Sequence, residues 1–262
     1  MRHSDGPDLN FIDSPAFYLA AIPAILLTGI SKGGFAGAFS GLSVPLLALA
    51  ISPLQAAGVM LPILIFMDFF GLTQFWRKAD FKVLATMLGG GLIGTAIGWA
   101  TFRALDENLV RIIVGLIAVV YPLSRWLTPS APKPAAASLA RGSFWTSIGG
   151  YTSFVAHAGG PPALVYLMPL RLEKAALVAT NGVFFAYLNL IKLPPYAMLG
   201  QINLTNLGTA LILCPLVPIG IKLGMWLQGK FTTEQFYRIG QTCIFLTGSK
   251  LLFDGLQNLS IL

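Results

Sequence analysis

The chain has 262 residues, of which 55% are hydrophobic and only 10% charged, and its mean hydropathy is +0.75. Soluble domains carry about 25% charged residues, so the composition argues against a soluble helical core. The net charge of +7 does not indicate a nucleic-acid-binding face, because lysine and arginine fall mainly at the ends of apolar segments. We therefore expect an all-α polytopic membrane protein that contacts the lipid bilayer and no nucleic acid.

Residues 1–14 contain three aspartates and lack the basic-then-apolar layout of a signal peptide. We expect them to form a short polar N-terminal tail, with the first apolar segment acting as the insertion signal. Cys214 and Cys243 lie in apolar segments without CxxC spacing, which is typical of packing residues rather than of a disulfide or a metal site.

Apolar segments recur along the rest of the chain with lengths that approach a membrane span. They fall at about 15–31, 35–52, 54–76, 81–103, 107–127, 143–157, 160–170, 174–193, 203–229 and 232–255. A stretch rich in proline and alanine, 128–142, interrupts the series and reads as an exposed cytoplasmic linker. It divides the chain into a first membrane repeat, 15–127, and a second, 143–256.

Two of these apolar regions are broken by residues that do not suit a lipid-facing helix. The first break, from Ile30 to Pro45, holds four glycines, three serines, a lysine and a proline, and the second is His157-Ala158-Gly159-Gly160-Pro161-Pro162. Non-helical backbone at membrane depth is tolerated only where it is buried in protein or lines a cavity. Interrupted segments in corresponding places of two halves point to the binding site of a transporter.

The two halves share ordered features that indicate a duplicated unit. Residues 93–98 (IGTAIG) resemble residues 219–224 (IGIKLG), and Pro45 aligns near Pro162. If each broken region enters and leaves on one side, the basic turns at 77–82, 125–141, 171–174 and 230–238 share the cytoplasm. In this arrangement fewer cations lie outside, and Lys192 is one of them. If each broken region instead crosses the membrane once, the difference in lysine and arginine between the two sides largely disappears. We therefore predict two inverted repeats, each a broken or re-entrant hairpin plus three transmembrane helices, with both termini outside.

Lys32 is the most informative single residue of the first break. A lysine deep in a membrane costs about 3 kcal/mol or more unless something compensates it. One interpretation of Lys32 is a cation that holds an anionic substrate beside backbone amides left free by Gly33 and Gly34. The other, equally consistent with the sequence, is a lysine at a helix end that snorkels, so that its ammonium group extends to the lipid headgroups. Asp68, well inside the 54–76 segment, is the candidate for proton coupling or for pairing with Lys32.

The remaining candidate substrate-binding residues come from the two breaks and the helix after the second one. The glycines and prolines of the breaks predict two short helices that start near Pro45 and Pro162. The N-termini of such helices favour anions. The alternative role for these small residues is close packing between helices. Gly89–Gly91, Gly94 and Gly98 we assign to such packing. Asn189 and Lys222 fit either a polar role in the site or an ordinary structural one. The candidates are Ser31, Lys32, Gly33, Gly34, Ser40, Gly41, Ser43, Pro45, His157, Gly159, Gly160, Pro161 and Asn181.

This pattern resembles the TauE/SafE family of sulfite and organosulfur-anion exporters. The resemblance rests on Ser31 to Gly37 with Ser43-Val44-Pro45, on His157 to Pro162, and on the turn Arg77-Lys78-Ala79-Asp80-Phe81, and it covers about residues 15–255. Residues 39–43 depart from the denser glycine run that family members often have. The resemblance implies a multi-pass protein of the bacterial inner membrane that exports a small sulfur-containing anion, with coupling to an ion gradient.

Other functions remain open at this point. They are a permease for another small solute, such as a carboxylate or a metal ion, and a membrane assembly protein without transport activity. With two histidines, two isolated cysteines and no triad, phosphate loop or haem motif, the sequence predicts no enzyme, no cofactor and no metal site. It leaves a homo-oligomer open.

Overall fold

The computed structural model describes residues 11–38, 40–47, 50–102, 107–127 and 134–258, and every regular element in these ranges is helical. The all-α expectation is therefore confirmed for this part of the chain. The helices are α1 (Pro15–Gly34), α2 (Ser43–Leu47), α3 (Pro53–Phe75), α4 (Phe81–Thr101), α5 (Glu107–Trp126), α6 (Leu139–Ala156), α7 (Gly160–Leu167), α8 (Lys174–Met198), α9 (Leu204–Leu213), α10 (Leu216–Lys230) and α11 (Thr233–Asn258).

Local sequence explains where several of these helices begin. The side chain of Asp80 accepts hydrogen bonds from the amides of Lys82 and Val83, at 3.0 and 3.1 Å, and so caps α4. Asn203 caps α9 through the amide of Asn206 in the same way, at 2.9 Å. The first amide groups of a helix have no carbonyl partner within the helix. Asp80 and Asn203 accept hydrogen bonds from such amides, which an apolar side chain cannot do.

Four helices of the described chain are long and apolar enough to cross a membrane: α1, α3, α4 and α8. A fifth crossing arises if α9 and α10 form one span, bent by 48° between Leu213 and Leu216. The apolar segment that we placed at 203–229 is divided between these two helices. Pro215 lies at the bend, where it precedes the first residue of α10. α5 and α11, which we expected to complete three spans in each half, are not among the candidates.

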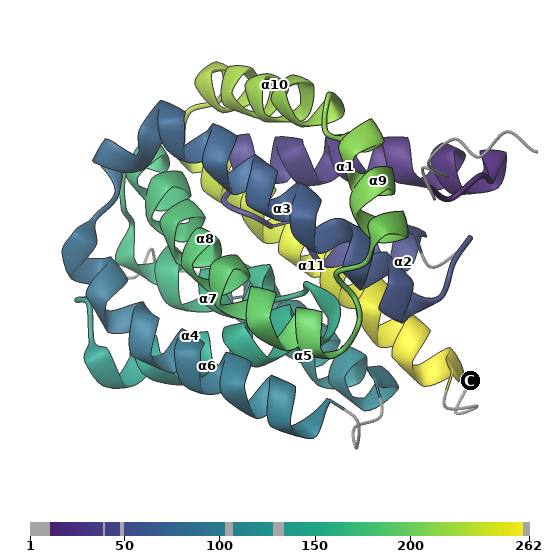
Figure 1. Ribbon diagram of the computed structural model, residues 1–262. Helices are drawn as coiled ribbons and strands as arrows, with labels where there is room; N and C mark the ends of the chain where they lie inside the picture. Colours follow the sequence, from purple (N-terminus) through teal and green to yellow (C-terminus); the bar gives the residue numbers. More distant parts are fainter. Residues whose placement is uncertain (1–10, 39, 48–49, 103–106, 128–133, 259–262) are drawn as a thin grey trace, which may run out of the picture.

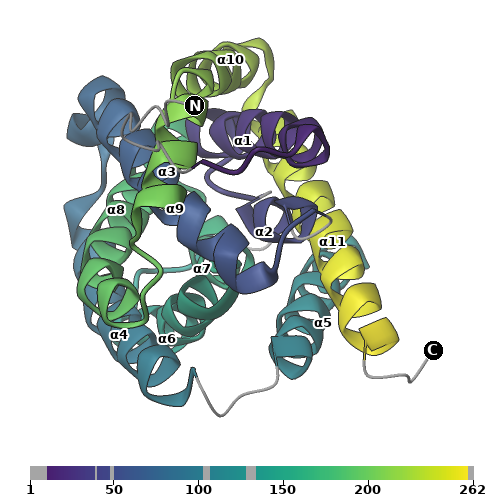
Figure 2. The same ribbon diagram turned by 45° about the vertical axis from the view of Figure 1, so that its right-hand side comes forward.

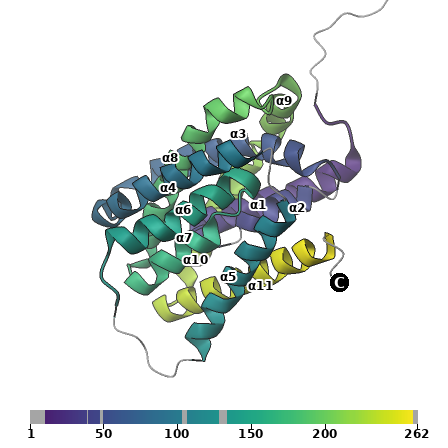
Figure 3. The same ribbon diagram turned by 90° about the horizontal axis from the view of Figure 1, so that it is seen from below.

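Helices of the first half pack mainly against helices of the second half. The most extensive helix contacts all join the first half to the second: α4 with α6, α5 with α11, α1 with α10, and α3 with α8. Figure 1 shows α1 alongside α10 and α4 alongside α6, and α5 and α11 run together in Figure 3. If α1, α3, α4 and α5 correspond to α6, α8, α10 and α11, the contact of α4 with α6 is equivalent to that of α10 with α1. The contacts of α3 with α8 and of α5 with α11 are then each equivalent to themselves. The pairing is therefore reciprocal, as a duplicated unit with two-fold pseudosymmetry requires.

Glycines allow a close approach of the helices at two of these contacts. A Cβ atom on Gly29 of α1 would lie 2.9 Å from the Cα atom of Gly220 on α10, and one on Gly90 of α4 would lie 2.6 Å from the Cα atom of Ser143 on α6. The packing roles predicted for Gly90, Gly91, Gly94 and Gly98 agree with these close approaches, whereas nothing lies within 4 Å of such an atom on Gly89. Small residues thus set the distance between the halves.

Helix ends differ from the predicted segments in three further places. α1 continues through Gly33 and Gly34, so the first break starts at Phe35 and not at Ile30. α6 begins at Leu139, inside the stretch that we assigned to the linker, whose residues 128–133 lie outside the described ranges. α8 runs on through Pro194 and Pro195 to Met198, five residues beyond the segment predicted from hydropathy.

Candidate functional site

The two breaks end their helices with the same backbone geometry. Ala36 and His157 both adopt the left-handed conformation, at φ 51° and 52°. The next residue in each break, Gly37 or Ala158, donates its amide to the carbonyl six residues back, at 3.0 and 3.2 Å. The two helix ends, whose left-handed residues are 121 positions apart in the chain, therefore share one backbone geometry.

The breaks come together near the middle of the molecule. A Cβ atom on Gly41 would lie 3.5 Å from the Cβ atom of Ala158 and 3.1 Å from Cγ2 of Thr247 on α11. Figure 2 shows α2 and α7, the short helices that follow the breaks, within the ring formed by the longer ones. As predicted, these short helices start near Pro45 and Pro162, at Ser43 and Gly160.

A narrow cavity lies where the first break faces α3 and α8. Its volume is about 380 Å³, which includes the open mouth. The side chains of its polar lining are Lys32, Asp68 and Asn181. Its wall also includes Ala36 and Gly37 of the break, and on the apolar side Phe75 and Phe185. The cavity therefore combines a few polar groups with an apolar surround, as small-ligand sites do.

Lys32 forms an ion pair with Asp68, and the two side chains are 13% and 6% exposed. The pairing that we expected as one role of Asp68 is therefore present, and it holds the Lys32 ammonium group at the cavity. Lys222 is exposed on α10 and does not line this cavity.

Asn181 lines the cavity from α8. Its Nδ2 donates a 2.6 Å hydrogen bond to the carbonyl oxygen of Ala36, which fixes the orientation of the amide, because a carbonyl only accepts. Its Oδ1 atom is then buried with no hydrogen-bond partner among the described residues. An acceptor in this state favours a ligand or water molecule that carries a donor.

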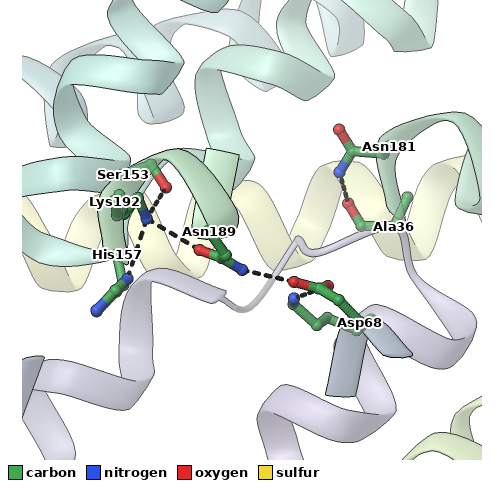
Figure 4. A network of polar contacts seen from close by, with 8 residues as sticks. Ala36, Asp68, Ser153, His157, Asn181, Asn189 and Lys192 are labelled. Atoms are coloured by element: carbon green, nitrogen blue, oxygen red, sulfur yellow. Dashed lines mark hydrogen bonds and ion pairs between the residues drawn. The ribbon is translucent and has the colours of Figure 1, made fainter. Parts of the chain in front are cut away.

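A chain of buried hydrogen bonds leads from this cavity to the second break (Figure 4). The second carboxylate oxygen of Asp68 accepts from Nδ2 of Asn189 at 2.6 Å, and Oδ1 of Asn189 accepts from Nζ of Lys192 at 3.1 Å. The same Nζ atom donates to Oγ of Ser153 at 2.7 Å and contacts Nδ1 of His157 at 3.3 Å. Nε2 of His157 lies 3.1 Å from the carbonyl oxygen of Ala57 on α3.

Lys192 is the residue that sequence reasoning misplaced. We expected it among the cations outside the membrane, but its side chain is fully buried, at 0% relative exposure. The predicted segment stopped at 193 because of Pro194 and Pro195, which put Lys192 at a helix end. The informative signal was the spacing of Asn189 and Lys192, which places both polar side chains on one face of a helix.

The other predicted site residues lie around the cavity rather than in its wall. Gly33 and Gly34 face the backbone of α10, and Gly159 faces α6 and Phe185. Ser31, Ser43, Gly160 and Pro161 are buried at the helix ends, and the side chains of Ser40 and Pro45 lie outside what the structure describes. Their direct contact with a substrate stays a prediction. Within the described ranges, no group of three or more His, Cys, Asp or Glu residues is placed to hold a metal ion.

Comparison with known proteins gives one match. A family model described as "Sulfite exporter TauE/SafE" matches residues 21–251 of the chain. No curated protein and no solved structure matches it at a significant level. The matched range includes both breaks, the cavity and the buried hydrogen-bond chain.

Proposed function

Because the chain belongs to the TauE/SafE family of membrane exporters, we propose that it is a secondary transporter that exports a small organosulfur anion such as sulfite, sulfoacetate or a related sulfonate. The observation that carries this proposal is the cavity at the first break. It is lined by a cation, Lys32, and by Asn181, whose Oδ1 atom has no hydrogen-bond partner among the described residues. The bacterial inner membrane is its proposed location.

The cavity chemistry suits a small oxyanion. The ammonium group of Lys32 and the second N–H of the Asn181 amide donate to anionic oxygens, while Oδ1 of Asn181 accepts from an acidic O–H group or a bound water molecule. Hydrogen sulfite offers both an anionic oxygen and such an O–H group. Asp68, at the inner end of the cavity, connects the bound anion to the rest of the polar chain and is the proposed coupling residue.

The proposed mechanism is alternating access. In this proposal the repeats are inverted, and the two breaks meet near the bilayer midplane and expose the site to one side at a time by rocking of the two halves. The reciprocal helix contacts and the matching ends of the two breaks support a duplicated unit of this kind. A homo-oligomer is compatible with the proposal but is not required by it.

The test begins with purified protein, whose thermal stability is measured with sulfite, thiosulfate, sulfoacetate, taurine and simple carboxylates. A ligand that binds only the folded state raises the melting temperature. Release of the stabilising anion from proteoliposomes then measures transport. If no anion raises the melting temperature or leaves the vesicles, the proposal is wrong, and a response to carboxylates alone would identify a carboxylate permease instead.

Asn181→Leu provides the site-specific arm of this test. Loss of a hydrogen bond to a charged ligand costs about 1.5–3 kcal/mol, so we expect at least a tenfold weaker affinity for sulfite. Asn258→Leu, at the exposed end of α11, is the matched control and should bind as the unmodified protein does. Equal affinities of the two variants would remove Asn181 from the site.

A further inference from the structure

The charges of the buried polar chain do not balance. Lys32 and Asp68 cancel one another, whereas the acceptors around Lys192 are the neutral groups of Ser153, Asn189 and His157. Among the described residues, no carboxylate other than Asp68 is bonded to this chain, and Asp68 reaches Lys192 only through Asn189. A protonated Lys192 therefore leaves one excess positive charge in the interior of a membrane protein, where charge is costly.

The surroundings of Lys192 accommodate both of its protonation states. An ammonium group has three N–H donors, and three acceptors, Ser153, Asn189 and His157, lie around Nζ. A neutral amine has two N–H donors and one lone pair. Asn189 and His157 then take the two donors, and the Ser153 hydroxyl rotates to donate to the lone pair. The site thus exchanges a proton without moving a heavy atom.

His157 itself is held in one form by its second contact. Nε2 faces the carbonyl oxygen of Ala57, an acceptor, so this nitrogen carries the hydrogen and Nδ1 presents a lone pair to Lys192. Tyr196, one turn beyond Lys192 on α8, donates its hydroxyl to the carbonyl of Phe154. Because an alkyl amine is a stronger base than an imidazole, Lys192 is the group around Nζ that takes up a proton first.

From this arrangement we propose that Lys192 takes up one proton when a singly charged anion occupies the cavity, so that the occupied site carries no net charge. The anion supplies the negative charge that the protonated network lacks, and Asp68 and Asn189 connect the two events. Asp68 then acts as the fixed counter-charge, while the exchanged proton resides on Lys192. By linkage, a proton on Lys192 strengthens anion binding by the same factor as the anion strengthens proton binding. This inference rests on the proposed function.

The test measures proton uptake on sulfite binding in weakly buffered solution with a pH-indicator dye. Sulfite itself exchanges protons, so the quantity of interest is the difference between the unmodified protein and Lys192→Met. We expect the unmodified protein to take up about one proton more for each sulfite bound. Lys222→Met, which removes an exposed lysine of α10, is the matched control and should behave as the unmodified protein.

Ser153→Ala is the second variant, because Lys192→Met buries a changed side chain and risks poor folding. Without the hydroxyl, the ammonium form of Lys192 loses one of its three acceptors. Because a hydrogen bond to a charged group is stronger than one to a neutral group, Lys192 then stays neutral when the anion binds, and the extra uptake should fall below one half. Full uptake in Ser153→Ala, or equal uptake in Lys192→Met and the unmodified protein, would overturn the inference and leave sulfite binding intact. Absence of sulfite binding to the unmodified protein would instead refute the proposed function, and this inference with it.

Discussion

At the residue scale, Asp68 is held from two sides, by the ammonium group of Lys32 and by the amide of Asn189. This arrangement argues against the snorkelling interpretation of Lys32, while its contact with a substrate stays a prediction. A lysine that snorkels would extend its ammonium group to the headgroups, whereas the side chain here is 13% exposed and paired. The ion pair places a positive and a negative charge at the same cavity, so removal of one partner affects the other.

We predict that Lys32→Met destabilises the protein by about 3 kcal/mol, because it leaves the buried Asp68 carboxylate without its cation. Lys32→Met combined with Asp68→Asn should recover most of this loss, since both charges are then gone. Thermal unfolding in detergent measures both variants. The control is Lys250→Met, whose lysine is 53% exposed and pairs with Asp254 on α11, and its expected cost is below about 1 kcal/mol. A double variant no more stable than Lys32→Met would contradict this account.

At the element scale, the contact between α4 and α6 depends on small residues in register. Gly90 faces the backbone of Ser143, while its neighbour Gly89 is exposed and has open space beside it. Two adjacent glycines in one helix therefore have opposite roles: one permits a close approach, and the other only weakens the helix.

We predict opposite signs for the two alanine substitutions. Gly89→Ala should stabilise the protein by about 0.5–1 kcal/mol, because alanine is the better helix former. Gly90→Ala should destabilise it by about 1–3 kcal/mol, because the added methyl group overlaps the backbone of α6. Melting temperatures of the two variants, compared in one detergent, provide the measurement. Destabilisation by both, or by neither, would show that α4 and α6 are not packed as described.

At the scale of the whole molecule, the helix contacts between the two halves are reciprocal, and the distribution of lysine and arginine favours a cytoplasmic location for the basic turns. We predict that both termini lie outside and that the turn at Arg77–Lys82 lies inside. Alkaline phosphatase, which is active only outside, should be active when fused after Leu262 and inactive when inserted after Lys78. Activity at both positions, or at Lys78 alone, would contradict inverted repeats with this orientation.

Part of the candidate site could be predicted because breaks in apolar segments are local features. Gly159-Gly160-Pro161-Pro162 cannot continue a membrane helix, and α6 ends and α7 begins where this run predicts. The first break was placed too early, because glycine alone does not end a helix. Gly33 and Gly34 stay helical where they pack on α10. Whether a glycine serves a turn or a contact depends on a neighbour that is distant in the sequence.

The amino-acid sequence by itself determined the membrane class, the presence of two interruptions and the position of the second, and it singled out Lys32 and Asp68 as charges inside apolar segments. The reason is that transfer of each residue from water into lipid depends mainly on its own chemistry. Only the tertiary structure decided that α8 continues past Pro194 and that Asn189 joins Asp68 to Lys192. The physical reason is that the free energy of a buried charge depends on its hydrogen-bond partners, and the partners of Lys192 include residues of another helix, 35 to 39 positions away in the chain.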